Sequence, residues 1–363
     1  MDIFLDDKTL LHLLRAAARD SGIALAPAQV VRPTPLGLTT AKLNRLGVDS
    51  LLAYLRVPED RPLGILVPDA RSRVRSRGFD CSIDGFPRGT APFRQLVSAD
   101  PEHPSPLVPD SGAVYVLSPQ NVALHMARRI RRMELGKKMG HAEAVLMILK
   151  LCLELCGTYV HDPFDPLRGE VAYGVEPSLT TEDLTAFLAS FGTEQGLALA
   201  REAASYCYDL SGSPQESFLG PALFFPSRFG GLQLGEFVAN GPLMLSPSQR
   251  ELIGGRTITP DFQLVGYDAV IEYKGAVHEE GDNPRIDHVR ALDYQTLGKR
   301  DFSFVYDDVC RQEDFNESAA RIVAATAQRD GAKTVRRFER LRKDERFLER
   351  QRILFRVFRP WLR

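Results

Sequence analysis

The sequence predicts a mixed α/β protein with an N-terminal α/β domain over residues 1–210 and an α/β sandwich around a small mixed sheet over residues 211–330. Two observations predict this class. Short apolar segments of strand length alternate with longer segments of helical periodicity. Neither internal repeats nor low-complexity stretches interrupt that alternation. At 363 residues the chain is long enough for two domains.

The elements of the N-terminal domain begin and end at ordinary helix and turn signals. Ser118-Pro119 is a helix start, and Cys156-Gly157 is a helix stop. Helices are expected over 7–20, 118–132, 141–155 and 180–192, and a further helix ends at about residue 208. Strands are expected over 63–67, 77–83 and 114–117. No phosphate-binding glycine loop, zinc cluster or nucleophilic triad stands out in this domain. Target recognition or partner binding are the hypotheses for its role.

The C-terminal domain is expected to begin after the turn-forming segment Ser211-Gly212-Ser213-Pro214. Its pattern predicts a helix, a hairpin, a helix, a strand and a helix, over 214–224, 257–274, 284–297, 302–306 and 313–329. This order predicts an α/β sandwich around a small mixed sheet.

The hairpin over 257–274 places its polar residues on one face. Gly266 and Tyr267 are expected as the two loop residues, because glycine suits the φ > 0 of the first position of a type II′ turn. That register places Asp261 opposite Glu272. Side chains alternate along a strand, so the polar face carries Thr259, Asp261, Gln263, Val270, Glu272 and Lys274, and the apolar face carries Ile258, Pro260, Phe262, Leu264, Ala269, Ile271 and Tyr273.

Two carboxylates that face each other across a ladder repel. At about 4 Å and an effective dielectric near 20 the repulsion is roughly 4 kcal/mol. A metal ion, the ammonium of Lys274 or a raised pKa would offset it. Oxygen ligands of this kind suit Mg²⁺ or Mn²⁺. An edge hairpin with ordinary solvated charges is the alternative, and the clean partition of the two faces argues against it.

Pro260-Asp261 followed by Glu272-Tyr273-Lys274 resembles the signature of the PD-(D/E)XK nuclease superfamily. Residues 210–330 are similar to the very-short-patch-repair-like endonuclease domain found at the C-terminus of many bacterial proteins. The matching landmarks are Ser213-Pro214-Gln215-Glu216, Gly275, His278, Asp287, Arg290, Leu292, Gly298 and the strand over 302–306. Where that family commonly has Asp-Gly, this chain has Lys274-Gly275, which brings it closer to the broader superfamily.

The resemblance implies a restriction-endonuclease-like fold and a catalytic set of Asp261, Glu272 and Lys274. Asp261 and Glu272 would ligate Mg²⁺ or Mn²⁺, together with the carbonyl of Tyr273 and with Glu216 as a third carboxylate. The metal would lower the pKa of a bound water and stabilise charge on the scissile phosphate. Lys274 would orient that water or neutralise the developing charge.

Several of these residues have a second interpretation. Glu216 also fits a capping box with Ser213, which needs no metal. His278 is a proton donor, a phosphate contact, a ligand or an unremarkable residue after a strand. Gln263 contacts substrate or is simply solvated. Arg290 contacts phosphate or forms a surface ion pair on its helix.

The composition is that of an ordinary globular protein, with 44% hydrophobic and 26% charged residues. No stretch is apolar enough to span a bilayer, and the N-terminus lacks the basic start of a signal peptide. Five scattered cysteines imply no disulfide framework. We therefore expect a cytoplasmic protein without a membrane partner.

Residues 331–363 predict one basic amphipathic helix, because apolar residues recur there at helical spacing among many Lys and Arg. This helix could offer its outer face to phosphates. Further basic runs occur at 71–77 and 128–138. The net charge of −1 gives no global attraction to nucleic acid. A solvated face, a membrane surface and a partner helix are the alternatives for the C-terminal helix.

The leading functional hypothesis is a metal-dependent endonuclease that hydrolyses DNA through a metal-activated water, in bacterial defence or repair. A DNA-binding or antitoxin-like regulatory protein without cleavage is the first alternative; the arrangement of the N-terminal residues faintly resembles the leading region of abortive-infection antitoxin-like proteins. An RNA nuclease is the second: DNA is the expected substrate, but the contacts that distinguish RNA from DNA would lie in the N-terminal domain. The sequence is also compatible with a homodimer.

Overall fold

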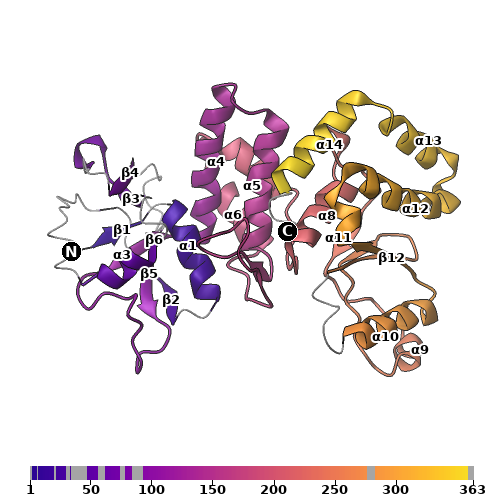
Figure 1. The fold of residues 1–363 in the computed structure, drawn as a ribbon, viewed down its shortest axis with the longest axis horizontal. Helices are drawn as coiled ribbons and strands as arrows, with labels where there is room; N and C mark the ends of the chain where they lie inside the picture. The colour runs from indigo at the N-terminus through magenta and orange to yellow at the C-terminus, as the bar shows by residue number, and fades with distance from the viewer. Residues whose placement is uncertain are drawn as a thin grey trace.

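The structure of the protein is a computed structural model that describes residues 2–5, 7–19, 22–29, 33, 47–55, 62–73, 78–83, 93–275 and 283–358. Over these residues the chain is a mixed α/β protein with several small sheets and thirteen α-helices. Figure 1 shows strands at both ends of an elongated molecule, with helices between them.

The N-terminal end contains a four-stranded mixed sheet of order β1-β6-β5-β2 and a separate parallel pair, β3-β4. The bounds are β1 Ile3–Phe4, α1 Asp7–Ala18, β2 Ile23–Pro27, α3 Asp49–Leu55, β3 Leu63–Val67, β4 Phe79–Ile83, β5 Phe93–Ser98 and β6 Val114–Leu117. The predicted strands over 63–67 and 114–117 are confirmed. The sequence analysis missed β1, β2 and β5, because β1 is only two residues long and the other two lack clean alternation.

Helices form the middle of the molecule. They are α4 Pro119–Leu135, α5 His141–Leu155, α6 Thr181–Ala189 and α7 Leu197–Ala204, with the short strands β7 Tyr159–Val160 and β8 Ala172–Tyr173 beside them. The predicted helix over 141–155 is confirmed at both ends. A buried two-point ion pair joins the first helix to this layer, since Arg15 donates to Glu154 over 2.7 and 2.8 Å.

The C-terminal end is built around a four-stranded mixed sheet of order β12-β11-β10-β9. β9, β10 and β11 are antiparallel neighbours, whereas β12 lies parallel to β11 and is reached through helix α10. The bounds are α8 Pro214–Phe224, β9 Phe237–Ala239, α9 Pro247–Leu252, β10 Phe262–Leu264, β11 Ala269–Lys274, α10 Asn283–Thr296, β12 Arg300–Val305, α11 Tyr306–Cys310 and α12 Gln312–Asp330. The predicted order of elements and the mixed sheet are confirmed, and β9, α9 and α11 are additions.

The chain after α12 forms two helices, α13 Ala332–Leu341 and α14 Glu345–Phe358, so the expectation of a single C-terminal helix is wrong. Asp344 explains the break, because its carboxylate accepts from the backbone N–H of Arg346 and so caps a new helix. α14 then packs back on α5, where the ammonium of Lys150 donates to the carbonyl of Val357 over 2.9 Å.

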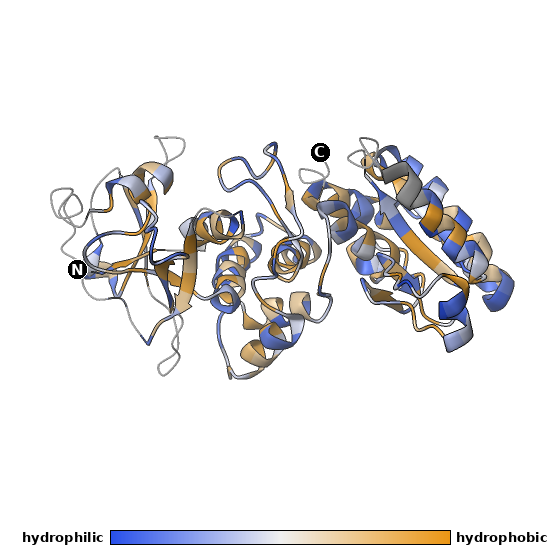
Figure 2. Cartoon of the chain, turned by 90° about the horizontal axis from the view of Figure 1, so that it is seen from below, coloured by the Kyte–Doolittle hydropathy of each residue, from blue (hydrophilic) through white to orange (hydrophobic). Residues whose placement is uncertain are grey.

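One hydrophobic core extends through all three regions, from Ile3 to Phe358. Figure 2 shows the hydrophobic strands of both ends flanked by helices of mixed hydropathy. Among the described helices, none is both long and apolar enough to cross a membrane.

Candidate active site

The predicted register of the hairpin is confirmed, and its turn is corrected. Phe262 pairs with Ile271 and Gln263 with Val270, as the sequence predicts. The turn closes through a bond from the N–H of Tyr267 to the carbonyl of Leu264, so Gly266 occupies its third position rather than the first loop position. Its φ of +79° is the left-handed conformation that glycine adopts at that position of a type II turn.

Both faces of the hairpin are covered by other parts of the chain. Phe262 and Ile271 belong to the main core, whereas Val270 packs in a smaller cluster with Tyr294 of α10 and with Leu297, which directly follows that helix. Ile258 belongs to this smaller cluster and not to the apolar face of the hairpin. β10 begins only at Phe262, so strand alternation does not extend back to Ile258. The chain before Asp261 therefore lies outside the ladder, and Lys274 is paired with Val305 of β12 instead of Thr259.

Glu272 is the most enclosed member of the predicted site, with 3% of its surface exposed. The hydroxyl of Tyr294 donates to its Oε1, and Nη1 of Arg290 lies 3.3 Å from its Oε2. Burial and then the charge of Asp261 raise the pKa of Glu272 to about 8, against the opposing effects of Arg290 and Tyr294. A carboxyl group with this pKa holds a proton over much of the neutral range.

Asp261 lies at the entrance to β10 and is fixed by its neighbours. Its Oδ2 accepts from the backbone N–H of Tyr273 over 2.6 Å, and its carbonyl accepts from the N–H of Asn240. Burial and then the charge of Glu216 raise its pKa well above the usual range of an aspartate. The register and the shared electrostatics thus bring Asp261 and Glu272 together as the sequence predicts.

Glu216 accepts hydrogen bonds at the start of α8 and also interacts electrostatically with the carboxylate pair. Its oxygens accept from the N–H of Gly212 at 2.8 Å and from the hydroxyl of Ser213 at 3.0 Å, and Ser213 Oγ accepts the N–H of Glu216 at 3.1 Å. Burial raises the pKa of Glu216 to about 7; these bonds oppose the shift, and the charge of Glu272 adds to it. Ser213 therefore caps α8 as predicted, whereas Glu216 accepts from the N–H of Gly212 instead of completing a capping box with the N–H of Ser213. The Glu216 side chain lies within electrostatic reach of the pair.

Lys274 shares its face of the sheet with two residues that the sequence analysis missed. Its Nζ lies 3.7 Å from Oδ2 of Asp301, to which Ser303 also donates. Because Val270 pairs with Asp301 and Glu272 with Ser303, both β12 residues face the same side as Glu272. Polar and aromatic residues alternate in the sequence Asp301-Phe302-Ser303-Phe304, which indicates a strand with one polar face. Only the parallel pairing shows that this strand adjoins β11.

The remaining predicted site residues have mixed outcomes. Arg290 forms an ion pair with Glu272 of β11 at 3.3 Å, and the side chain of Asp287, its predicted partner on the helix, lies outside the described part of the structure. The amide of Gln263 donates to the carbonyl of Gly241, so its nitrogen has a structural partner. His278 lies outside the described residues. Tyr294 was missed, although its position four residues after Arg290 puts both on one helical face.

The donor set fits a hard divalent cation. Mg²⁺ is commonly held by one or two carboxylates and several waters, and Asp261 and Glu272 supply such a pair. Burial raises the pKa of both acids, and a bound cation would favour their charged forms. Over the described ranges, no three His, Cys, Asp or Glu side chains are already grouped tightly enough to hold a metal. The oxygens of Glu216 instead accept from Gly212 and Ser213 at the start of α8.

Comparisons with known proteins add no relative. No protein-family model matches the sequence, and no curated protein or solved structure is significantly similar to the chain.

A Tyr294→Phe variant should shift metal binding to higher pH. The hydroxyl of Tyr294 stabilises the charged form of Glu272, so its removal should raise the pKa of Glu272 further. A divalent cation would then compete with a more tightly held proton. Titration calorimetry with Mn²⁺ across pH 6–9 would measure the shift. Tyr267→Phe is the matched control, because that hydroxyl donates to Asp330 instead. Identical pH profiles for Tyr294→Phe and the wild type would contradict the assigned role.

Proposed function

We propose that the chain is a metal-dependent phosphodiesterase that cleaves DNA, with a restriction-endonuclease-like C-terminal domain. One observation carries the proposal: Asp261, whose carboxylate accepts from the N–H of Tyr273, lies beside the buried carboxyl group of Glu272, and Lys274 follows on the same face of β11. A structural ion pair would not need two carboxylates enclosed together. Such an arrangement is costly in the absence of a cation and is typical of catalytic sites.

Each residue of the site has a distinct part in this proposal. Asp261 and Glu272 would hold the cation, which supplies an activated water and stabilises charge on the phosphate. Tyr294 and Arg290 orient Glu272 through their bonds to its two oxygens. The ammonium of Lys274 would neutralise charge that develops on the phosphate oxygens. Asp301, 3.7 Å from Lys274, holds that ammonium on this face of the sheet.

The outer face of α13 supports a nucleic-acid substrate. Lys333, Arg336, Arg340 and Lys343 are exposed and recur three or four residues apart, so the first three share one face of the helix and Lys343 follows its end. Unlike Arg342, which pairs with Glu339, none of the four has a carboxylate partner among the described residues. The opposite side of α13 is anchored by the buried ring of Phe338. Unpaired cations on a fixed helix are the usual means of contacting a phosphate backbone.

We expect a Lys333→Gln/Arg336→Gln/Arg340→Gln variant to bind duplex DNA more weakly and with less dependence on salt. Each lost phosphate contact should reduce the slope of log K against log salt by about 1. Fluorescence anisotropy in EDTA at several salt concentrations would measure both effects. Arg352→Gln is the matched control, because Arg352 already pairs with Glu345 and Glu349. An unchanged slope in the triple variant would remove α13 from the DNA-binding surface.

The direct test is cleavage of supercoiled plasmid, single-stranded DNA and RNA by the purified protein with Mg²⁺, Mn²⁺ or EDTA. Metal-dependent cleavage of DNA that is lost in Lys274→Ala would support the proposal. Cleavage of RNA alone would make the protein an RNA nuclease. Salt-sensitive DNA binding without cleavage in either metal would favour a regulatory DNA-binding protein.

A further inference from the structure

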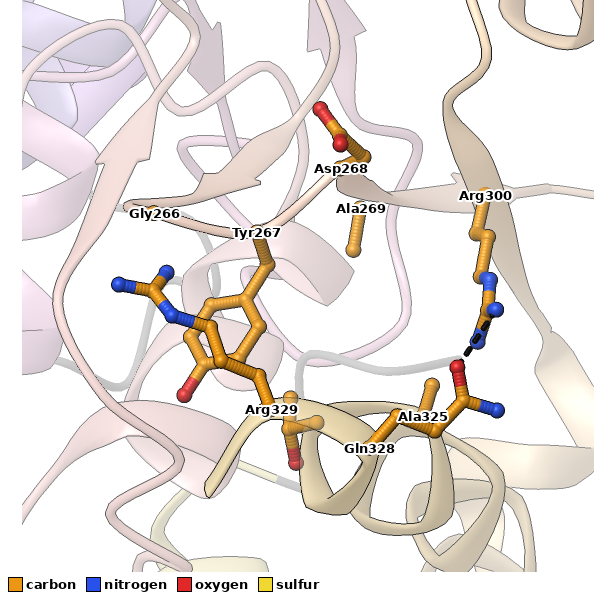
Figure 3. A pocket seen from close by; sticks show the side chains of 9 residues that line it. Gly266, Tyr267, Asp268, Ala269, Arg300, Ala325, Gln328 and Arg329 are labelled. Atoms are coloured by element: carbon orange, nitrogen blue, oxygen red, sulfur yellow. Dashed lines mark hydrogen bonds between the residues drawn. The ribbon is translucent and has the colours of Figure 1, made fainter. Parts of the chain in front are cut away.

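A second candidate site lies between the β10–β11 turn and helix α12. It is a pocket of about 270 Å³ (Figure 3). The lining residues are Gly266, Tyr267, Asp268, Ala269, Arg300, Ala325, Thr326, Gln328 and Arg329. The volume lies just below the range of about 300–1,000 Å³ that is typical of small-molecule sites. The pocket therefore suits a ligand no larger than a single nucleotide.

The pocket lies on the opposite face of the sheet from the carboxylate pair. Ala269 pairs with Arg300 and belongs to the same core as Ile322 and Val323 of α12. Val270, the next residue, packs against α10 on the face that carries Glu272. Because neighbouring residues of a strand point to opposite faces, the pocket is separate from the proposed active site.

The charges around the pocket favour an anion. Each nearby carboxylate already has a partner: Lys299 pairs with Asp268 at 2.7 Å, and the hydroxyl of Tyr267 donates to Asp330. Among the described residues, the guanidinium groups of Arg300 and Arg329 have only neutral partners. Arg300 donates to the amide oxygen of Gln328 over 2.7 Å.

Arg329 lies 5.0 Å from the centre of the Tyr267 ring, and Figure 3 shows it across the pocket from Arg300. Among the described residues neither guanidinium has a carboxylate partner. Gly266 allows Arg329 this position, since a Cβ there would lie 2.3 Å from its Nη1.

We infer that this pocket binds the phosphate group of a nucleotide. Guanidinium groups bind phosphate oxygens through paired, charge-assisted hydrogen bonds. Arg300 and Arg329, which lie on opposite sides of the pocket, would both attract the anion, and the amide of Gln328 beside Arg300 adds a neutral donor. Ala269 and Ala325 leave space for the attached sugar. The ligand is either a free nucleotide or a terminal nucleotide of a strand, because both present the same chemistry.

The test is calorimetric titration of the full chain with deoxyadenosine monophosphate, beside unphosphorylated deoxyadenosine. EDTA keeps the carboxylate pair free of metal, so the proposed nuclease activity does not enter the result. We expect saturable binding of the nucleotide that weakens with salt, and at least tenfold weaker binding of deoxyadenosine. Arg300→Gln and Arg329→Gln should each weaken nucleotide binding about tenfold or more. Both side chains are exposed, so the variants should fold.

Arg321→Gln, another exposed arginine of α12 outside the pocket, is the matched control and should bind like the wild type. Glu272→Gln should also bind normally, which distinguishes this site from the active site. Competition by a 5′-phosphorylated oligonucleotide would identify a strand end as the ligand, and its failure to compete would identify a free nucleotide. The inference is overturned if the wild type does not bind the nucleotide, if deoxyadenosine binds equally well, or if both pocket variants retain full affinity.

Discussion

Lys274→Ala is expected to lower the rate of DNA cleavage about 10²–10³-fold, the usual effect of removing one charge-stabilising group at a reacting centre. The affinity for Mg²⁺ should change little, because the ammonium is not a ligand and the oxygens of Asp261 and Glu272 remain. The side chain is already held on the active face by Asp301, at 3.7 Å. Single-turnover cleavage and Mn²⁺ calorimetry on the same preparation would separate the two effects.

Asp261→Ala should lose both properties, since it removes one of the two proposed carboxylate ligands. Retained metal affinity in Asp261→Ala would count against the assigned ligand set. Arg168→Ala, which removes an exposed cation in the segment between β7 and β8 and outside the basic runs, is the control and should cleave normally. Cleavage that survives Lys274→Ala unchanged would indicate a contaminating nuclease or a different catalytic group.

Glu272→Gln is expected to stabilise the metal-free protein at pH 8. In the folded protein the pKa of Glu272 is raised from its usual 4.5 to about 8, so the folded state binds the proton more tightly than the unfolded state. The wild type therefore loses stability as the pH rises from about 4.5 to about 8, whereas glutamine does not titrate. Each unit of pKa shift corresponds to about 1.4 kcal/mol, and after local relaxation we expect a gain of about 2–4 kcal/mol. The gain should nearly vanish at pH 4.

Thermal unfolding at pH 4, 6 and 8 in EDTA would measure this gain. Saturating Mg²⁺ should stabilise the wild type, because a ligand that binds only the folded state raises its stability, and this effect should be lost in the variant. Glu251→Gln, an exposed carboxylate on α9, should show neither effect. A destabilised Glu272→Gln protein at pH 8 would show that Glu272 acts as a structural anion for Arg290 and Tyr294 rather than as a metal ligand.

Local patterns in the sequence were sufficient wherever a single element carried the signal. Proline and glycine punctuation located α5 and α8, and alternation located the register of β10 and β11, because these features depend on residues close together in the chain. That register alone placed Asp261 beside Glu272. The sequence did not determine the position of Gly266 in the turn, because a glycine with φ > 0 fits more than one turn position.

The rest of the candidate site depended on which elements meet in space. Strand pairing brought Asp301 and Ser303 beside Lys274, and the packing of α10 brought Tyr294 and Arg290 onto the oxygens of Glu272. The enclosure that raises the pKa values of these acids likewise comes from distant segments.

The sequence by itself determined the class of the fold, the hairpin and its pair of acids, because local periodicity and turn residues specify them. Only the tertiary structure decided that the pair is enclosed, that the oxygens of Glu216 accept from Gly212 and Ser213, and that two arginines flank a separate pocket. Burial and electrostatic coupling are properties of surfaces brought together by folding, and no local pattern contains them.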